Sequence, residues 1–209
     1  MADDSTHDFG WNSDAAPCSC DYLAPVVLDI LKKLGSQRVM DLGAGNGALC
    51  AMIKSQGLDA AGLEYDREGC AIAQRAHPDI PFHNMSVEDD PAKLLALEAP
   101  FDTVVSTEVI EHLFSPHFLP IFAAGVLKPG GHLVISTPYH GYLKNLALSV
   151  FDKWDFHHTA LWHGGHVKFW SRKTLTQLLE ANGFQVTGFT GVGRVPFLWK
   201  SMILIARKV

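Results

Sequence analysis

Val39 to Gly47 reads V-M-D-L-G-A-G-N-G, an apolar run that passes through an acid, Asp41, into three glycines at alternate positions. A strand-to-helix turn of this kind brings the backbone close to a ligand. Only residues without a Cβ allow both that approach and positive φ angles, which Gly43, Gly45 and Gly47 supply. The stretch therefore predicts a turn that binds a nucleotide-type cofactor.

A second acid, Glu64, ends the next apolar run, Leu58 to Leu63. A carboxylate at the end of the second strand of such a unit can accept hydrogen bonds from the hydroxyls of a ribose. We therefore expect Asp41 and Glu64 to flank the glycine turn in one cofactor site.

The pattern D-x-G-x-G-x-G differs from the G-x-G-x-x-G of dinucleotide-binding domains. It resembles motif I of the class I S-adenosylmethionine-dependent methyltransferases, and the resemblance continues at 86–89 (S-V-E-D), 101–108 (F-D-T-V-V-S-T-E) and 127–138 (L-K-P-G-G-H-L-V-I-S-T-P). It implies S-adenosylmethionine as the cofactor, with Asp41 facing its methionine amino end, Glu64 its ribose and residues 85–87 its adenine. The implied contacts are Asp41, Gly43, Ala44, Gly45, Glu64, Tyr65, Met85, Ser86, Val87 and Thr107. Core packing is the alternative role for Met85.

Strand and helix patterns alternate along the chain, which predicts an α/β fold with a seven-stranded, mainly parallel, doubly wound sheet. Strands are expected at 38–42, 58–64, 81–84, 101–106, 131–136, 184–190 and 198–206, and helices at 22–34, 48–55, 67–76, 110–127 and 172–182. The last two strands are separated only by G-V-G-R-V-P, so we expect them to pair as an antiparallel hairpin. The resemblance implies the same Rossmann-like methyltransferase fold, with an antiparallel last strand.

Composition limits the other possibilities. With 47% hydrophobic residues the 209-residue chain can bury a large core, and a single domain over 1–209 with a flexible segment at 1–20 is expected. A formal charge of −5 gives no global positive field and argues against a nucleic-acid partner. No signal peptide or membrane-spanning run is evident, so we expect a cytoplasmic protein with free cysteines and a small-molecule partner.

The connection from 138 to 170 is longer than an ordinary loop and rich in aromatic residues and histidines. It begins at the carboxyl end of a strand, where open α/β sheets bind their ligands, so we interpret it as a lid over the acceptor substrate. In the alternative interpretation, Leu143 to Phe156 forms an amphipathic helix that packs on the sheet and places its aromatic side chains in the core.

A second group of reactive residues, Glu108-Val-Ile-Glu111-His112, lies where the fourth strand is expected to give way to a helix. Positions i, i+3 and i+4 share one helical face, so these two carboxylates and one imidazole are expected to converge. Such ligands suit Mg²⁺ or Mn²⁺, which could bind the acceptor and lower the pKa of its hydroxyl. In the alternative, the helix dipole favours the acids and the histidine only braces the loop.

The E-x-x-E-H sequence resembles both the ubiquinone-biosynthesis O-methyltransferases and the small-RNA 3′-terminal 2′-O-methyltransferases. The second resemblance implies a metal held by Glu108, Glu111, His112 and a later histidine, either His163 or His166. His166 is favoured because the residues after it match that family better. Without a metal, His158, His163 or His166 is a candidate general base, and the catalytic candidates are His112, His163 and His166.

The function predicted from these features is O-methylation of a small hydroxylated acceptor, aromatic or lipid-linked, with possible assistance from a divalent metal. Methylation of RNA 3′ ends is the alternative, with a phosphate track from Lys144, Lys153, Lys168, Arg172 and Lys173. Methylation of nitrogen or carbon in a small metabolite stays open, because the acceptor atom leaves no trace in the motif. A cofactor-binding protein without activity is the remaining class.

Overall fold

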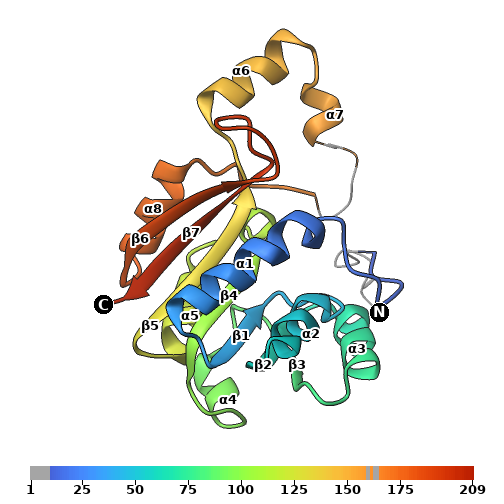
Figure 1. Ribbon diagram of the computed structural model, residues 1–209, viewed down its shortest axis with the longest axis vertical. Coiled ribbons are helices and arrows are strands. Elements are labelled where there is room, and N and C mark those ends of the chain that lie inside the picture. Colours follow the sequence, from blue (N-terminus) through green and yellow to red (C-terminus); the bar gives the residue numbers. More distant parts are fainter. Residues whose placement is uncertain (1–9, 159–160, 162–164) are drawn as a thin grey trace.

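The computed structural model describes residues 10–158, 161 and 165–209, and one twisted sheet runs through it (Figure 1). Its seven strands lie in the order β3-β2-β1-β4-β5-β7-β6. The strands are β1 (Arg38–Leu42), β2 (Asp59–Glu64), β3 (Phe82–Asn84), β4 (Phe101–Thr107), β5 (Leu127–Pro138), β6 (Phe184–Val192) and β7 (Ser201–Lys208). The predicted fold class is therefore confirmed.

The strands from β3 to β5 are parallel, whereas β7 lies between β5 and β6 and is antiparallel to both. The connection from β6 to β7 is too short to hold a crossover helix, which is why a hairpin forms. The sequence prediction of this hairpin is confirmed. Since β1, β2, β4 and β5 run the same way, their carboxyl ends meet at one edge of the sheet.

Helices cover both faces of the sheet (Figure 1). Apolar residues of α1 and α2 pack with β1, β4 and β5 on one face, where α3 adds a smaller cluster, and those of α4, α5 and α8 fill the main core on the other face. These helices are α1 (Cys20–Leu34), α2 (Ala48–Ser55), α3 (Arg67–Ala76), α4 (Pro91–Leu95), α5 (Phe118–Val126) and α8 (Arg172–Glu180). Of these, the sequence prediction missed only α4.

The predicted helix over 110–127 is wrong in its first half. The chain forms one short 3₁₀ turn, η2 (Ile110–His112), and α5 begins only at Phe118. Pro116 explains the break, because a proline ring disfavours helical geometry at the preceding residue and removes a backbone donor. The residues between η2 and α5 therefore form an irregular segment at the sheet edge.

Beyond β5 the chain leaves the sheet and forms α6 (Tyr142–Val150) and α7 (Trp154–His158), which project from the body of the molecule (Figure 1). The alternative interpretation of 143–156 as one helix packed on the sheet is wrong, because Phe151 and Trp154 are exposed rather than core residues. Trp170 does belong to the core. The predicted catalytic candidate His163 lies outside the described residues.

Candidate active site

The glycine turn follows β1 as expected. Gly43, Gly45 and Gly47 have φ angles of 83°, 55° and 83°, which strongly favour glycine. A Cβ on Gly43 would overlap the side chain of Val109. Because Val109 directly precedes η2, this contact places the glycine turn beside the segment that carries Glu111 and His112.

Asp41 lies at the end of β1 with only 2% of its surface exposed. Its Oδ2 accepts a weak hydrogen bond from the Cys50 thiol (3.7 Å), and its Oδ1 has no partner among the described residues. Burial raises the pKa of Asp41 to about 7. A buried carboxyl group with an unpaired oxygen fits a ligand that brings an ammonium group, such as the methionine end of S-adenosylmethionine.

We predict that Asp41→Asn raises the melting temperature of the ligand-free protein at pH 8 by roughly 5 °C. The folded state binds a proton on Asp41 that the unfolded state releases above pH 4, so stability falls as pH rises from about 4 to 7. Asparagine removes this cost. Thermal unfolding at pH 5 and pH 8 is the measurement, and the increase in melting temperature should be smaller at pH 5. An equal increase at the two pH values would contradict a buried carboxyl group that titrates.

Glu64 ends β2 and its carboxylate is oriented by two backbone N–H groups. Gly45 donates to Oε2 and Asp66 donates to Oε1, both at 2.7 Å. Burial raises the pKa of Glu64, and these two hydrogen bonds oppose the rise. Each carboxylate oxygen keeps a further lone pair, so the two oxygens can still accept the vicinal hydroxyls of a ribose.

The other predicted cofactor residues differ from one another in burial and in hydrogen bonding. Ala44 donates its N–H to the Leu63 carbonyl within the turn (3.0 Å), Tyr65 is exposed, and Thr107 is half-buried at the end of β4. Met85 and Val87 pack against the main core, as the alternative for Met85 anticipated, and the Ser86 N–H donates to Asp89. Their contact with adenine remains a prediction.

Trp11 is a site residue that no sequence motif identifies. Its indole lies against Gly45 and Gly69, where Cβ atoms would overlap it. Asn46 is buried and holds the same segment by donating to the carbonyls of Ser13 (3.0 Å) and Ala15 (2.8 Å). Residues 11–15 therefore pack onto the glycine turn, whereas residues 1–9 of the expected flexible segment lie outside the described residues.

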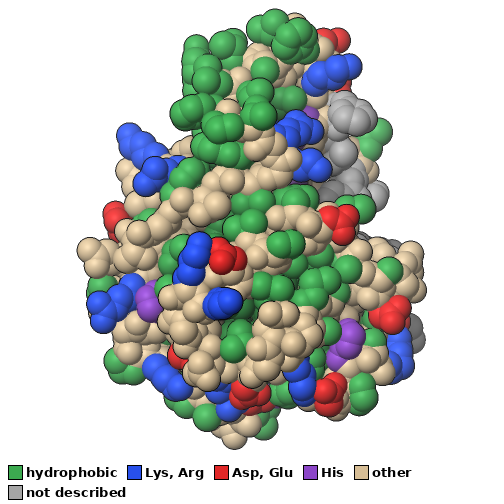
Figure 2. Space-filling model, in the orientation of Figure 1, with side chains coloured by type: hydrophobic (Ala, Val, Ile, Leu, Met, Phe, Trp, Pro, Cys, Tyr) green, Lys and Arg blue, Asp and Glu red, His purple; other side chains and the backbone are tan. Residues whose placement is uncertain are grey.

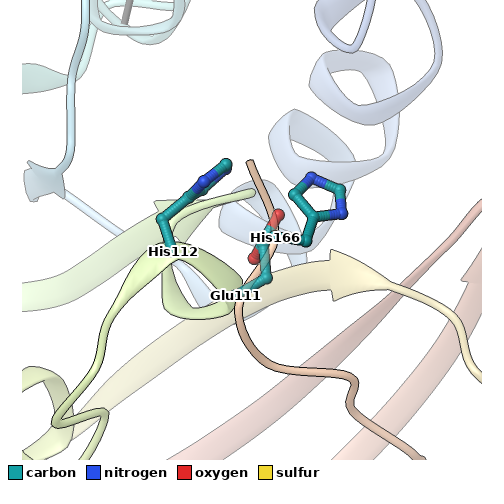
Figure 3. A group of neighbouring side chains, drawn as sticks. All are labelled: Glu111, His112 and His166. Carbon is teal, nitrogen blue, oxygen red and sulfur yellow. The ribbon is translucent and has the colours of Figure 1, made fainter. Parts of the chain in front are cut away.

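Glu111, His112 and His166 form the second part of the site. One ligand atom from each lies within 4.8 Å of the other two, and the two imidazoles lie on either side of the carboxylate (Figure 3). Glu111 is fully buried, with Oε2 accepting from Thr137 (3.0 Å) and Oε1 without a partner among the described residues. The orphaned oxygen and two imidazoles are a donor set that fits a divalent metal ion.

Backbone hydrogen bonds bring His166 to Glu111 from a distant part of the chain. The N–H groups of Val167 and Lys168 both donate to the Glu111 carbonyl, at 2.9 and 3.0 Å. The rings of His112 and His166 then meet edge to face with centroids 4.9 Å apart. The structure thus brings His166 together with Glu111 and His112, and their role as metal ligands stays a prediction.

Glu108 does not join this group among the described residues. It adopts a left-handed backbone conformation (φ 55°), and its two oxygens accept from the hydroxyls of Ser136 (2.8 Å) and Ser201 (3.1 Å). The expectation of a shared helical face for Glu108, Glu111 and His112 is wrong, because no α-helix forms there. Burial raises the pKa of Glu108 to about 7, and burial followed by the nearby Glu108 carboxylate holds that of Glu111 well above its usual range.

The described histidines between β5 and α8 separate into two sets. Burial lowers the pKa of His166 to about 4, with nearby His112 adding to the effect. At neutral pH His166 is therefore an uncharged imidazole, the form that binds metals, and a weak base. His158 instead stacks on His140, with centroids 5.5 Å apart.

Comparison with known proteins agrees with this architecture. The model of the family described as "Methyltransferase domain" matches residues 19–188. A ubiquinone biosynthesis O-methyltransferase of Bradyrhizobium diazoefficiens is 30% identical over 177 residues, which cover 80% of this chain. This chain spans 66% of the length of that relative.

Solved structures resemble this chain in fold. Magnesium protoporphyrin IX methyltransferase of Synechocystis PCC 6803, with bound S-adenosylhomocysteine, matches with a TM-score of 0.62 and 20% identity, covering 90% of this chain and 82% of the other. The 1,6-didemethyltoxoflavin-N1-methyltransferase of Burkholderia thailandensis matches with a TM-score of 0.63 and 21% identity, covering 90% and 77%. The second of these enzymes is named as a methyltransferase of a nitrogen atom, N1, so the fold does not determine the acceptor atom.

Proposed function

This chain belongs to the methyltransferase domain family of class I S-adenosylmethionine-dependent enzymes, and from that premise we propose that it methylates a hydroxyl oxygen of a small aromatic or lipid-linked acceptor. The proposal rests mainly on one observation. The group formed by Glu111, His112 and His166 lies beside the glycine turn, because Val109, two residues before Glu111, packs its side chain against Gly43. An acceptor bound at this group would lie next to the methyl donor. The name of the Bradyrhizobium relative supports oxygen as the acceptor atom.

The cofactor is held, in this proposal, by the turn and its two acids. Asp41 receives the methionine ammonium group, and Glu64 receives the ribose hydroxyls on the oxygens that Gly45 and Asp66 orient. The glycines let the backbone approach the ligand closely. These contacts fix the donor, so that transfer depends on how the acceptor is aligned with it.

The acceptor is positioned by Glu111, His112 and His166, which we propose also hold a divalent metal ion. A bound ion would stabilise the alkoxide or phenolate form of the acceptor. With two nitrogen donors and one oxygen donor, the group suits Mn²⁺ or a later transition metal better than Mg²⁺. The low pKa of His166 favours its role as a ligand over that of a general base.

We predict that Mn²⁺ binds the chelator-treated protein, saturated with S-adenosylhomocysteine, with micromolar affinity in titration calorimetry. Glu111→Ala and His166→Ala each remove a ligand and should abolish the binding. His117→Ala is the matched control, because His117 lies in the same irregular segment but outside the group. Glu108→Gln should weaken binding less than about fivefold, since serine hydroxyls already bind both Glu108 oxygens.

The same titration can contradict the metal. Absence of Mn²⁺ binding, or binding that survives both Glu111→Ala and His166→Ala, would mean that this group holds no metal and that its side chains alone position the acceptor.

A screen of catechols, simple phenols, amines and an RNA 3′ end, in which methyl transfer from labelled S-adenosylmethionine is measured, then identifies the acceptor class. Transfer to RNA with a steep loss of affinity in salt would replace the small-molecule proposal.

A further inference from the structure

Helix α6 turns a cation toward the protein. An amphipathic helix normally buries its apolar stripe, but the one buried residue of α6 is Lys144, which is 3% exposed. Figure 2 shows apolar side chains gathered on the outside of the molecule over α6. None of the described helices, α6 included, is long and apolar enough to cross a membrane. The inward side of α6 therefore presents an ammonium group to the body of the protein.

The Lys144 ammonium lies at the carboxyl end of β5. It donates to the Lys200 carbonyl at 3.3 Å, and the same carbonyl accepts from the N–H of Tyr139, the residue after β5, at 3.0 Å. An ammonium group has three donors, and one carbonyl uses only one of them. Open α/β sheets bind ligands at the carboxyl ends of their strands, so Lys144 lies in the region where an acceptor is expected.

Three histidines lie beside this strand end. The His140 N–H donates to the Trp170 carbonyl (3.1 Å), and only 9% of His140 is exposed. Between centroids, its ring lies 5.5 Å from that of His158 and 6.1 Å from that of His157, and the last two rings are 5.0 Å apart. We call Lys144, His140, His157 and His158 the His–Lys cluster.

The His–Lys cluster has buried polar atoms that no described residue pairs with. They are the Nε2 atoms of His140 and His158. Burial, followed by the charge of Lys144, lowers the pKa of His140 and of His157 to about 4, so both rings are uncharged at neutral pH. Unpaired buried polar atoms beside an ammonium group destabilise a fold unless a ligand pairs with them.

No carboxylate of the described residues bonds to the Lys144 ammonium. Glu108 is close enough to act on its pKa, but both Glu108 oxygens accept from serine hydroxyls. Burial, followed by Arg194, lowers the pKa of Lys144 to about 8, so the group still carries its charge at neutral pH. The cluster therefore offers one buried positive charge among imidazole N–H donors, which suits an anionic ligand.

The His–Lys cluster adjoins the proposed metal-binding group. Phe169, three residues after His166, meets the rings of His140 and His158 edge to face, with centroids 5.1 and 5.0 Å apart. Two imidazoles of the cluster and its ammonium group also add to the low pKa of His166, after burial and His112. An acceptor held at the metal-binding group could therefore reach the cluster with another part of the same molecule.

We propose that the His–Lys cluster binds a carboxylate of the acceptor, so that the substrate is a hydroxylated carboxylic acid. This substrate class rests on the proposed methylation of a hydroxyl group. Lys144 supplies the charge, and the imidazoles of His140 and His158 donate from Nε2 to the carboxylate oxygens. One buried ammonium group among uncharged rings matches a single negative charge better than a phosphate dianion, which arginine side chains bind in a bidentate manner.

The test compares catechol acids with their primary amides, which are similar in size but uncharged. Protocatechuate, homoprotocatechuate and dihydrocaffeate place the carboxylate at increasing distances from the hydroxyls. In titration calorimetry on protein saturated with S-adenosylhomocysteine, at least one acid should bind about tenfold or more tightly than its amide.

Two variants remove the proposed contacts. Lys144→Met removes the charge, so the acid should bind no more tightly than its amide, whose own affinity should change less than about twofold. His140→Phe keeps a ring without the donor and should weaken the acid about fivefold or more. Lys153→Met is the matched control, because Lys153 is an exposed cation of the same connection outside the cluster. Circular dichroism checks folding, and His140→Phe serves as the test if Lys144→Met does not fold.

The proposal is overturned if the wild type binds every acid no more tightly than its amide, if the preference persists in both variants or is equally lost in Lys153→Met, or if phenyl phosphate binds more tightly than benzoate. Methyl transfer to the same compounds is measured separately. Transfer to acids and amides without preference keeps the O-methylation and removes the carboxylate site. Preferred binding of an acid, with no transfer to any catechol, keeps the site and contradicts the O-methylation.

Discussion

Glu111→Gln is expected to lower the rate of methyl transfer to an oxygen acceptor by about 100- to 10,000-fold. The wild-type carboxylate has one oxygen held by Thr137 and one buried oxygen without a described partner. Glutamine keeps the size of the side chain but offers one oxygen and one N–H₂ donor. Its oxygen can therefore accept from Thr137, but the N–H₂ group that replaces Oε1 can neither bind a cation nor take up the hydroxyl proton.

The measurement is single-turnover transfer from labelled S-adenosylmethionine, with catechol as the first acceptor. Affinity for S-adenosylhomocysteine should change less than about twofold, because the proposed cofactor contacts are at Asp41, the glycine turn and Glu64. His117→Ala provides the control for unrelated changes near α5. A Glu111→Gln enzyme that transfers methyl groups at the wild-type rate would remove Glu111 from the chemistry.

The pH dependence of the wild-type rate adds a second readout. Burial and the neighbouring Glu108 carboxylate hold the pKa of Glu111 well above its usual range in the ligand-free protein. A proton on Glu111 must leave before a cation can bind, so metal affinity and rate should both rise with pH. The agreement of these two profiles would tie the rate to the group rather than to general folding.

Local rules were sufficient for most of the sheet. The glycines after β1 had to adopt positive φ angles, and the short link from Val192 at the end of β6 to Ser201 at the start of β7 could form only a hairpin. Both features depend on residues that are close in sequence. The apolar runs of β1, β4 and β7 are also buried on both faces, so their pattern alone identifies them as inner strands.

The site was less predictable because it depends on contacts between distant segments. The E-x-x-E-H spacing predicts Glu108 and Glu111 on one helical face, but Pro116 delays the helix and Glu108 accepts hydrogen bonds from Ser136 and Ser201 instead. The hydrogen bond from the Val167 N–H to the Glu111 carbonyl joins segments that are far apart in the sequence, so the periodicity of either segment does not predict it. Only the resemblance to other proteins favours His166, because the residues themselves do not distinguish it from His163.

The connection from 138 to 170 illustrates a different limit. Leu143, Leu146 and Val150 have the spacing of a helix that packs on a core, and a pattern of this kind does not say which side of the helix the protein covers. The fold turns Lys144 inward, where its ammonium bonds to the Lys200 carbonyl. The same residues that suggested a buried helix therefore create an exposed apolar surface.

Glu64→Ala is expected to weaken the binding of S-adenosylhomocysteine by about 100-fold or more, which corresponds to about 3 kcal/mol. Two effects add. The ribose loses both proposed acceptors, and the N–H groups of Gly45 and Asp66 lose the carboxylate that orients them, which loosens the glycine turn. Titration calorimetry with S-adenosylhomocysteine measures the loss, and thermal unfolding reports whether the ligand-free fold is retained.

Glu64→Gln distinguishes these two effects. Its amide oxygen can still accept a hydrogen bond from one of the two backbone N–H groups, but its N–H₂ group cannot accept a hydrogen bond from a ribose hydroxyl. The loss should therefore be intermediate, about tenfold. Glu68→Ala is the control, since Glu68 lies nearby in the first turn of α3 but is exposed and pairs with Arg75. If Glu64→Ala binds S-adenosylhomocysteine as the wild type does, the ribose does not lie at Glu64 and the proposed orientation of the cofactor is wrong.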